Sequence, residues 1–285
     1  MTVATANGKR ATPRHANLVP RRHWGRALFA VMVGAFAVSV IFGLARNPNI
    51  DWSIVGDFLL DRNILRGLRK TLQMTVLATI FATSLAVVVA VMRISPSRVI
   101  SGTAAAYAFI FRGVPLIVLL ILIGNLGLFF KSFSLGIPFT DITLWSKPVK
   151  DVMTPFRASV IGLSLAGSGY MSEIVRGGLL AVGRGQHEAA TSIGLTSGKT
   201  LRHVVLPQAL RVIVPPLGNE LISMLKASAV VSVIAGGDLL TVALGISGSN
   251  FRTIEMLIVA TIWYLIVIVV LSVVQYFVER KVAER

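Results

Sequence analysis

HEAATSIGLTSGKTLRHVVLPQAL, from His187 to Leu210, is an amphipathic stretch between two long apolar segments. Apolar residues in its first part recur at helical spacing, and Gly194 and Gly198 allow a sharp turn after them. A second run mixes apolar and basic residues at helical spacing, and Pro207 is expected to end it. The stretch therefore predicts two short helices joined by a glycine turn. We expect a compact knob outside the membrane, with Glu188 in the first turn of its helix, where the dipole favours a carboxylate.

The whole chain is far more apolar than a soluble domain. Of its 285 residues, 54% are hydrophobic and 14% are charged, which predicts an all-α integral membrane protein. Its net charge of 28 − 12 = +16 lies in tails and loops between apolar spans. This distribution is typical of the positive-inside rule and not of a nucleic-acid-binding surface. Cysteine is absent, which excludes disulfides and thiolate metal sites.

Six apolar segments are each long enough to cross about 30 Å of hydrocarbon. They cover residues 27–45, 72–92, 103–123, 158–182, 209–234 and 254–278. Residues 1–26 form a basic tail without an acidic residue, and residues 279–285 form a second tail. Arginine and lysine near the span ends predict that both tails and the segment 183–208 are cytoplasmic. The polar segments 46–70, 124–156 and 236–252 are then expected to be external loops, and the aromatic residues of 124–156 suit the membrane interface.

Several motifs resemble the permease subunits of bacterial ABC importers. The order Glu188-Ala189-Ala190, Gly194 and Leu206-Pro207 is similar to the EAA coupling loop of that family. A competing interpretation as a phosphate-binding loop fails, because only three residues separate the glycines where that motif has four. Further runs resemble the polar amino acid branch, of the histidine and glutamine permease type, over residues 66–278. They are Arg66–Leu72, Phe111–Leu116, Gly169–Gly178, Leu206–Arg211 and Pro216–Asn219.

The resemblance implies a type I ABC importer permease, with a five-helix core and an extra N-terminal helix at 27–45. It implies transport of polar amino acids by alternating access in a bacterial inner membrane. The implied partners are two ATPase subunits, a second permease, identical or homologous, an external solute-binding protein and membrane lipid. The chain itself is expected to be neither an enzyme nor a holder of a cofactor. A secondary transporter or channel without an ATPase is the alternative. The sequence departs from the family at the long segment 124–156 and at Ala227, where an acid is common.

Charged residues inside the spans are the candidates for a substrate pathway, because each costs at least about 2.5–3.5 kcal/mol on insertion scales. Glu173 and Arg176 stand at i and i+3, which predicts an ion pair on one helix face. Arg112 precedes Pro115, where a broken helix could receive a substrate carboxylate, or Arg112 could pair with Glu173. The remaining candidates are Glu220 and Lys226, although Lys226 could instead extend to the membrane edge. No catalytic residue and no metal site is predicted.

Overall fold

The structure is a computed structural model that describes residues 24–136 and 143–283. Residues 1–50 and 51–285 form two separate compact units. The first contains helix α1 (Trp24–Ala45), which is apolar along its length, with a mean hydropathy of 2.5. This helix is long and apolar enough to cross a membrane, and it covers the span expected at 27–45. Most of the predicted basic tail, residues 1–23, lies outside the described residues.

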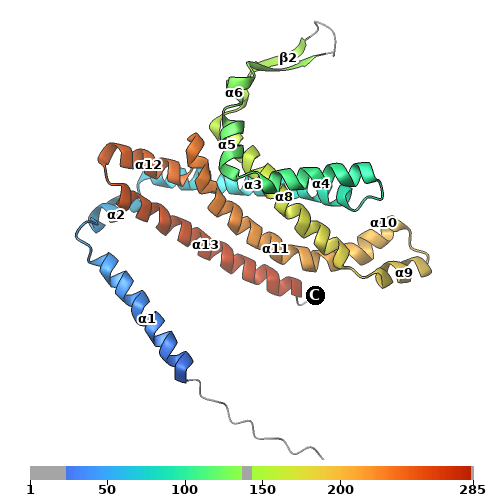
Figure 1. Cartoon of the computed structure of the whole chain (residues 1–285), viewed down its shortest axis with the longest axis horizontal. Helices are drawn as coiled ribbons and strands as arrows, with labels where there is room; N and C mark the ends of the chain where they lie inside the picture. Colours follow the sequence, from blue (N-terminus) through green and yellow to red (C-terminus); the bar gives the residue numbers. More distant parts are fainter. Residues whose placement is uncertain (1–23, 137–142, 284–285) are drawn as a thin grey trace, which may run out of the picture. The chain divides into compact units, whose positions relative to one another are not determined.

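The second unit is almost entirely helical and carries one small hairpin (Figure 1). Its elements in chain order are α2 (Trp52–Leu59), α3 (Arg62–Arg93), α4 (Arg98–Gly113), α5 (Leu116–Gly124), α6 (Leu126–Phe129), β1 (Ser132–Gly136), β2 (Thr143–Pro148), α7 (Val149–Val152), α8 (Pro155–Ala181), α9 (Arg184–Ser192), α10 (Ser197–Thr200), the π-helix η1 (Leu201–Val205), α11 (Leu206–Ala227), the 3-10 helix η2 (Ser228–Ile234), α12 (Leu239–Asn250) and α13 (Thr253–Ala283).

Helix α8 is the centre of the bundle and contacts α3, α4, α5 and α11. The face of α3 that packs in the core is built from Met74 and from alanines at four-residue spacing, Ala78, Ala82, Ala86 and Ala90. These small side chains let two helices approach closely, as is typical of helix pairs in membranes. Leu163 and Met171 of α8 fill the space between them.

Five of the six expected spans coincide with helices that are long and apolar enough to cross a membrane. The third is a bent pair, because α4 and α5 meet at 98° at the break that Pro115 was expected to introduce into the span 103–123. The fourth, α8, is 27 residues long but is not among these helices. It carries Glu173, Arg176 and many serines and glycines, which it can accommodate because neighbouring helices cover most of it.

Two segments expected as loops are largely helical, so these predictions were wrong. Segment 46–70 contains α2 and the start of α3, and segment 236–252 contains α12. Their aspartates cap helices: Asp51, Asp61 and Asp238 each accept hydrogen bonds from backbone N–H groups of the helix that follows. An N-terminal cap and an exposed loop both favour Asp, so composition alone did not distinguish them.

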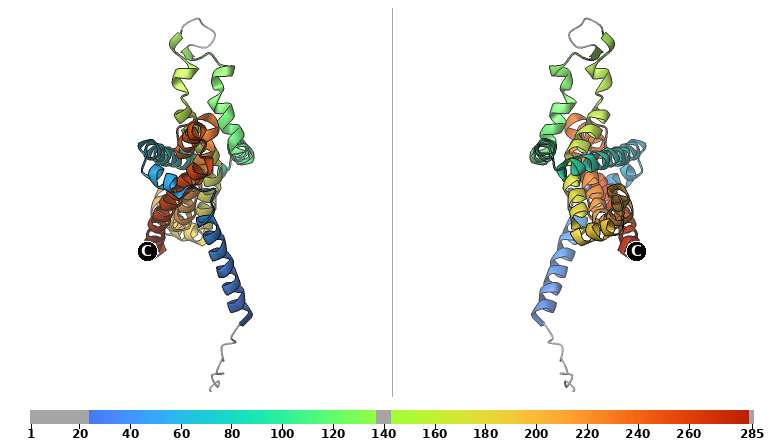
Figure 2. Two further views of the ribbon diagram at one scale, coloured as in Figure 1. Left: turned by 90° about the vertical axis from the view of Figure 1, so that its left-hand side faces the viewer. Right: turned by 90° about the vertical axis from the view of Figure 1, so that its right-hand side faces the viewer.

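The segment 124–156 forms a hairpin flanked by short helices instead of an irregular loop. Strands β1 and β2 pair antiparallel, with Phe133 opposite Lys147 and Ser134 opposite Ser146. The hairpin projects away from the helices of its unit in all views (Figures 1 and 2). Residues 137–142 at its tip lie outside the described part of the chain.

Candidate functional site

The stretch with which the sequence analysis began forms a helix, a tight turn and a second helix. Helix α9 ends at Ser192, and Gly194 makes the turn with a φ of +78°, a conformation that side-chain-bearing residues rarely adopt. The predicted knob is therefore present and consists of α9, the turn at Gly194, α10 and η1. Gly198, however, lies inside α10 and not in the turn.

Two details of the prediction were wrong. Pro207 does not end the second helix, because residues Ser197–Ile234 run on as one continuous helix. Pro207 is the second residue of α11 and follows the π-helical turn η1 within that continuous helix. Glu188 is the fifth residue of α9 and not in its first turn, because the helix already begins at Arg184.

The residues of the motif differ in their exposure to solvent. Glu188, Ala189, Gly194, Leu206 and Pro207 are exposed, while Ala190 is buried. Beside them, Ile193 leaves 77% of its surface exposed. Exposed apolar residues next to charged ones on a rigid turn are typical of a contact surface for another protein.

A side-chain hydrogen bond links α9 to the start of α11, and an irregular turn lies between α10 and α11. The Gln208 amide nitrogen donates to the Gln186 side-chain oxygen at 3.3 Å and to the Val204 carbonyl at 2.9 Å. Between α10 and α11, η1 has the wider π-helical turn. Such turns are rare and occur often at functional sites. Hydrophobic periodicity gave no signal of it.

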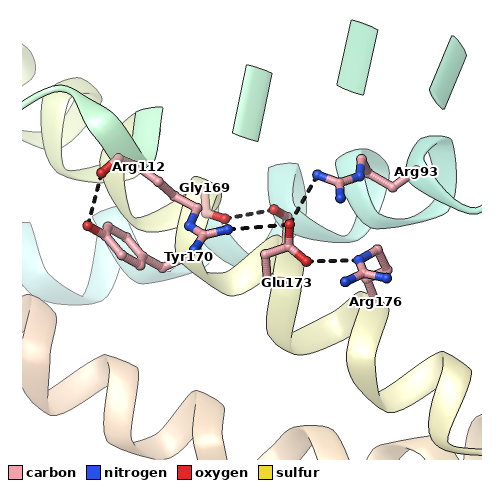
Figure 3. Close-up of polar contacts among 7 residues, drawn as sticks. Arg93, Arg112, Gly169, Tyr170, Glu173 and Arg176 are labelled. Carbon is pink, nitrogen blue, oxygen red and sulfur yellow. Dashed lines mark hydrogen bonds and ion pairs between the residues drawn. The ribbon is translucent and has the colours of Figure 1, made fainter. Parts of the chain in front are cut away.

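A second site is a charge cluster on the central helix α8, shown in Figure 3. Glu173 accepts from the Arg176 Nε at 2.8 Å, which confirms the predicted pair. Arg93 Nη1 lies 3.0 Å and Arg112 Nη1 lies 3.4 Å from the other oxygen of Glu173. The predicted pairing of Arg112 with Glu173 is thus also confirmed. The sequence analysis did not identify Arg93 as part of this cluster, because Arg93 is far from Glu173 along the chain.

Pro115 positions Arg112 within the cluster. Since proline cannot donate in a helix, α4 ends at Gly113 and leaves carbonyl groups without helical partners. The Tyr170 hydroxyl donates to one of them, the Arg112 carbonyl, at 3.2 Å. Gly169 admits this end of α4, because a Cβ there would lie 3.3 Å from the Arg112 backbone nitrogen. The bend and the small residue together bring Arg112 to Glu173.

The other two pathway candidates lie on α11. Glu220 is half-buried, and Lys226 is exposed in the last turn of the helix. Asn219 and Ser223 are exposed too, and with Lys226 they stand at i, i+4 and i+7, on one face. The structure therefore brings Arg112 and Glu173 together and places Glu220 and Lys226 on a different helix.

The fold and these sites define a multi-span helical membrane protein with a protruding helical knob. Residues 82–284 match the family described as "Binding-protein-dependent transport system inner membrane component", so the chain belongs to that family. It is a permease subunit, and a separate subunit hydrolyses ATP.

Named relatives extend over most of the chain. It is 38% identical, over 95% of its length and 84% of the relative's, to the arginine transport system permease protein ArgU of Corynebacterium glutamicum. It is 34% identical to the arginine transport system permease protein ArtQ of Bacillus subtilis, over 76% of this chain and 91% of that one.

Solved structures show the same fold. An amino acid ABC transporter crystallised with histidines is 35% identical, with a TM-score of 0.65 over 77% of this chain and 94% of that chain. The MetNI methionine ABC transporter has a TM-score of 0.60 at 22% identity, over 77% of this chain and 95% of that chain. The fold is that of a type I ABC importer permease, as the motifs implied.

Proposed function

We propose that this permease imports polar amino acids, with basic ones such as arginine the foremost candidates. The observation that carries the proposal is the 38% identity over 95% of the chain to a permease named for arginine transport. Relatives named for arginine, glutamine and cystine support the wider class of polar amino acids. The methionine transporter, at 22% identity, supports the fold alone.

The protein is a multi-pass inner-membrane protein that works with an ATPase and a substrate-binding protein. We further propose a complex of two ATPase subunits, this chain and a second permease, identical or homologous. The orientation that we propose has both termini and the α9–η1 knob in the cytoplasm, with the β1–β2 hairpin and α12 outside. The basic residues near the ends of the spans support this orientation.

The knob is proposed to dock into the ATPase and to transmit its motion. Glu188, Ala189, Gly194, Leu206 and Pro207 would form the contact surface, since all are exposed. Buried Ala190 would hold α9 against the membrane helices. Closure of the ATPase pair on ATP would then move the continuous Ser197–Ile234 helix, because the contact surface is at its start. That movement would switch the access of the pathway between the two sides of the membrane.

The polar face of α11 is proposed to line the substrate pathway. Asn219, Ser223 and Lys226 are exposed along a span, and polar side chains in lipid are costly. A second permease facing α11 would cover them and enclose a polar path. Glu220 adds a carboxylate that would attract a basic substrate. Arg112 and Glu173 remain candidates for a second part of the pathway. Arg112 lies at the end of α4, next to the bend between α4 and α5, and Glu173 lies beside it on α8.

ATP-driven uptake tests the proposal. The permease, its ATPase and its binding protein would be reconstituted in proteoliposomes and supplied with labelled amino acids. We expect uptake of arginine or another polar amino acid with ATP inside, and loss of uptake in a Glu188→Ala variant. Uptake driven by an ion gradient without the ATPase would contradict the importer assignment. ATP-driven uptake restricted to apolar amino acids would contradict the substrate class only.

A further inference from the structure

The Glu173 cluster carries more positive charge than its one carboxylate can neutralise. Three guanidinium groups, from Arg93, Arg112 and Arg176, surround Glu173, so the cluster has a net charge of 3 − 1 = +2. No other Asp or Glu pairs with these arginines among the ion pairs of the described residues. Charges within a membrane protein are normally paired, because an unpaired charge is costly there. The excess charge therefore calls for an additional anion.

A cavity beside the cluster has room for that anion. It has a volume of about 560 Å³ and is lined by Arg93, Ala105, Phe109, Arg112, Gly113, Tyr170 and Glu173. Arg176 does not line it and contacts the far oxygen of Glu173. Two of the three guanidinium groups thus face the cavity, while the third holds Glu173 in place.

The lining suits an oxyanion that carries an apolar chain. Each guanidinium presents five N–H donors in a fork that fits phosphate and carboxylate oxygens, and Glu173 uses only part of this capacity. Ala105 and Phe109 of α4 form an apolar side of the cavity, and Phe109 leaves 79% of its surface exposed. The two arginines can bind the oxygens of an anionic headgroup, and the exposed ring of Phe109 can contact the apolar chain attached to it.

The depth of the site fits the same ligand. Arg93 is the last residue of α3, at the end that the proposed orientation places on the cytoplasmic side. Glu173 is eight residues before the end of α8, or about 12 Å along the helix axis. In the proposed orientation, the cluster therefore lies in the cytoplasmic half of the membrane.

We propose that this cavity, between α4, α8 and the end of α3, binds the phosphate of an anionic phospholipid of the cytoplasmic leaflet through Arg93 and Arg112. The leaflet rests on the orientation proposed above, whereas the binding itself does not depend on transport. Bound lipid would offset one of the two excess positive charges and support the bend between α4 and α5. The two arginines could equally bind other oxyanions. The rival ligands are therefore free phosphate and the carboxylate of a substrate.

Native mass spectrometry of the full-length, delipidated protein in detergent tests this site. Phosphatidylglycerol and phosphatidylcholine would be titrated against the wild type and against Arg93→Gln and Arg112→Gln variants. We expect selective phosphatidylglycerol binding, about fivefold weaker in each variant, as for the loss of one basic residue at an anionic membrane surface. Arg93→Gln leaves the contact between α4 and α8 intact, so it remains informative if Arg112→Gln fails to fold.

Arg69→Gln is the matched control, because it removes the same charge from an exposed position at the other end of α3. It should bind phosphatidylglycerol as the wild type does. Glu173→Gln should bind it more tightly, because the competing carboxylate is gone. A merely structural role of the cluster would not produce that gain.

Three results of the lipid titrations would overturn the proposal, and a competition experiment adds a fourth. The three are equal binding of phosphatidylcholine, equal losses in the Arg69 and Arg93 variants, and weaker phosphatidylglycerol binding in Glu173→Gln. Competition with inorganic phosphate or free arginine at millimolar concentration distinguishes a lipid site from a site for a soluble oxyanion. Displacement of phosphatidylglycerol by either would assign the cavity to a soluble oxyanion and overturn the lipid assignment. These outcomes are independent of the uptake assay, so the proposed function can stand or fall separately.

Discussion

Glu173 joins three helices through one carboxylate, since Arg93 is the last residue of α3, Arg112 lies in the last turn of α4, and Arg176 lies with Glu173 on α8. The carboxylate is only about a quarter exposed, which limits solvent screening. Removing it leaves three arginines without their shared partner. We expect Glu173→Gln to lower the free energy of unfolding by about 2 kcal/mol, below the range for fully buried pairs. Thermal unfolding in detergent measures this, and Glu188→Gln, at an exposed position, should leave the melting temperature unchanged.

Asp238 gives a pH-dependent prediction outside the spans. Burial raises the pKa of its carboxyl above the usual value, although the Thr241 hydroxyl and two backbone N–H groups donate to it. The folded state therefore binds this proton more tightly than the unfolded chain does. Its contribution to stability is largest below the unfolded pKa and declines as pH rises through the folded pKa.

Asp238→Asn should remove this decline, because the amide still caps α12 but no longer ionises. Melting temperatures of both proteins between about pH 4 and about pH 8 test this. We expect the wild type to lose more stability than the variant as pH rises. Asp238→Ala also loses the cap and should cost about 1 kcal/mol at every pH. Parallel pH profiles for the wild type and the Asn variant would show that Asp238 does not titrate as described.

Two adjacent glycines show how closely α8 and α11 cross. A Cβ on Gly178 would lie 2.2 Å from Ile213 Cγ1 and 3.4 Å from the Ala209 carbonyl oxygen, whereas a Cβ on Gly177 would meet nothing within 4 Å. We expect Gly178→Ala to reduce the free energy of unfolding by about 1–3 kcal/mol through overpacking. Gly177→Ala should be neutral or slightly stabilising. Equal melting temperatures for the two variants would contradict this close crossing.

The knob contains a second matched pair of glycines. Gly194 needs a positive φ, although a Cβ there would meet no atom within 4 Å, while Gly198 is helical and equally open. A side chain at 194 therefore strains the backbone without a clash. We expect Gly194→Val to lower ATP-driven uptake at least about tenfold, as the turn shifts its docking surface. Membrane insertion should be intact, and Gly198→Ala should transport normally. Normal uptake by Gly194→Val would contradict the coupling role.

Element boundaries were predicted well where periodicity and length decide them, and poorly where caps do. The apolar runs of α1, α3 and α13 are unambiguous, because few structures other than spans bury such lengths. Aspartates before α2, α3 and α12 were interpreted as loops, since the same residue favours both caps and turns. The π-helical turn at η1 has no local signature.

The whole molecule divides at residue 50, which leads to a prediction about α1. The core unit is residues 51–285, and the family match begins at residue 82. Transport should therefore not depend on the particular sequence of α1. Replacing Trp24–Ala45 by an unrelated apolar helix of equal length keeps the topology, and we expect unchanged uptake and unchanged co-purification with the ATPase. Loss of co-purification would show that α1 has a specific role in assembly.

The sequence by itself determined the class of protein, five of the six expected apolar spans and the presence of the helical knob, since these depend on composition, length and local order. It also determined the pair of Glu173 and Arg176, because one helical turn joins them. Only the tertiary structure decided that Arg93 and Arg112 meet the same carboxylate, 80 and 61 residues away along the chain. That meeting requires the 98° bend at Pro115 and the close approach at Gly169. Pro115 sets the position of the break, but the angle of the bend and the approach at Gly169 depend on how helices pack, which no local pattern encodes.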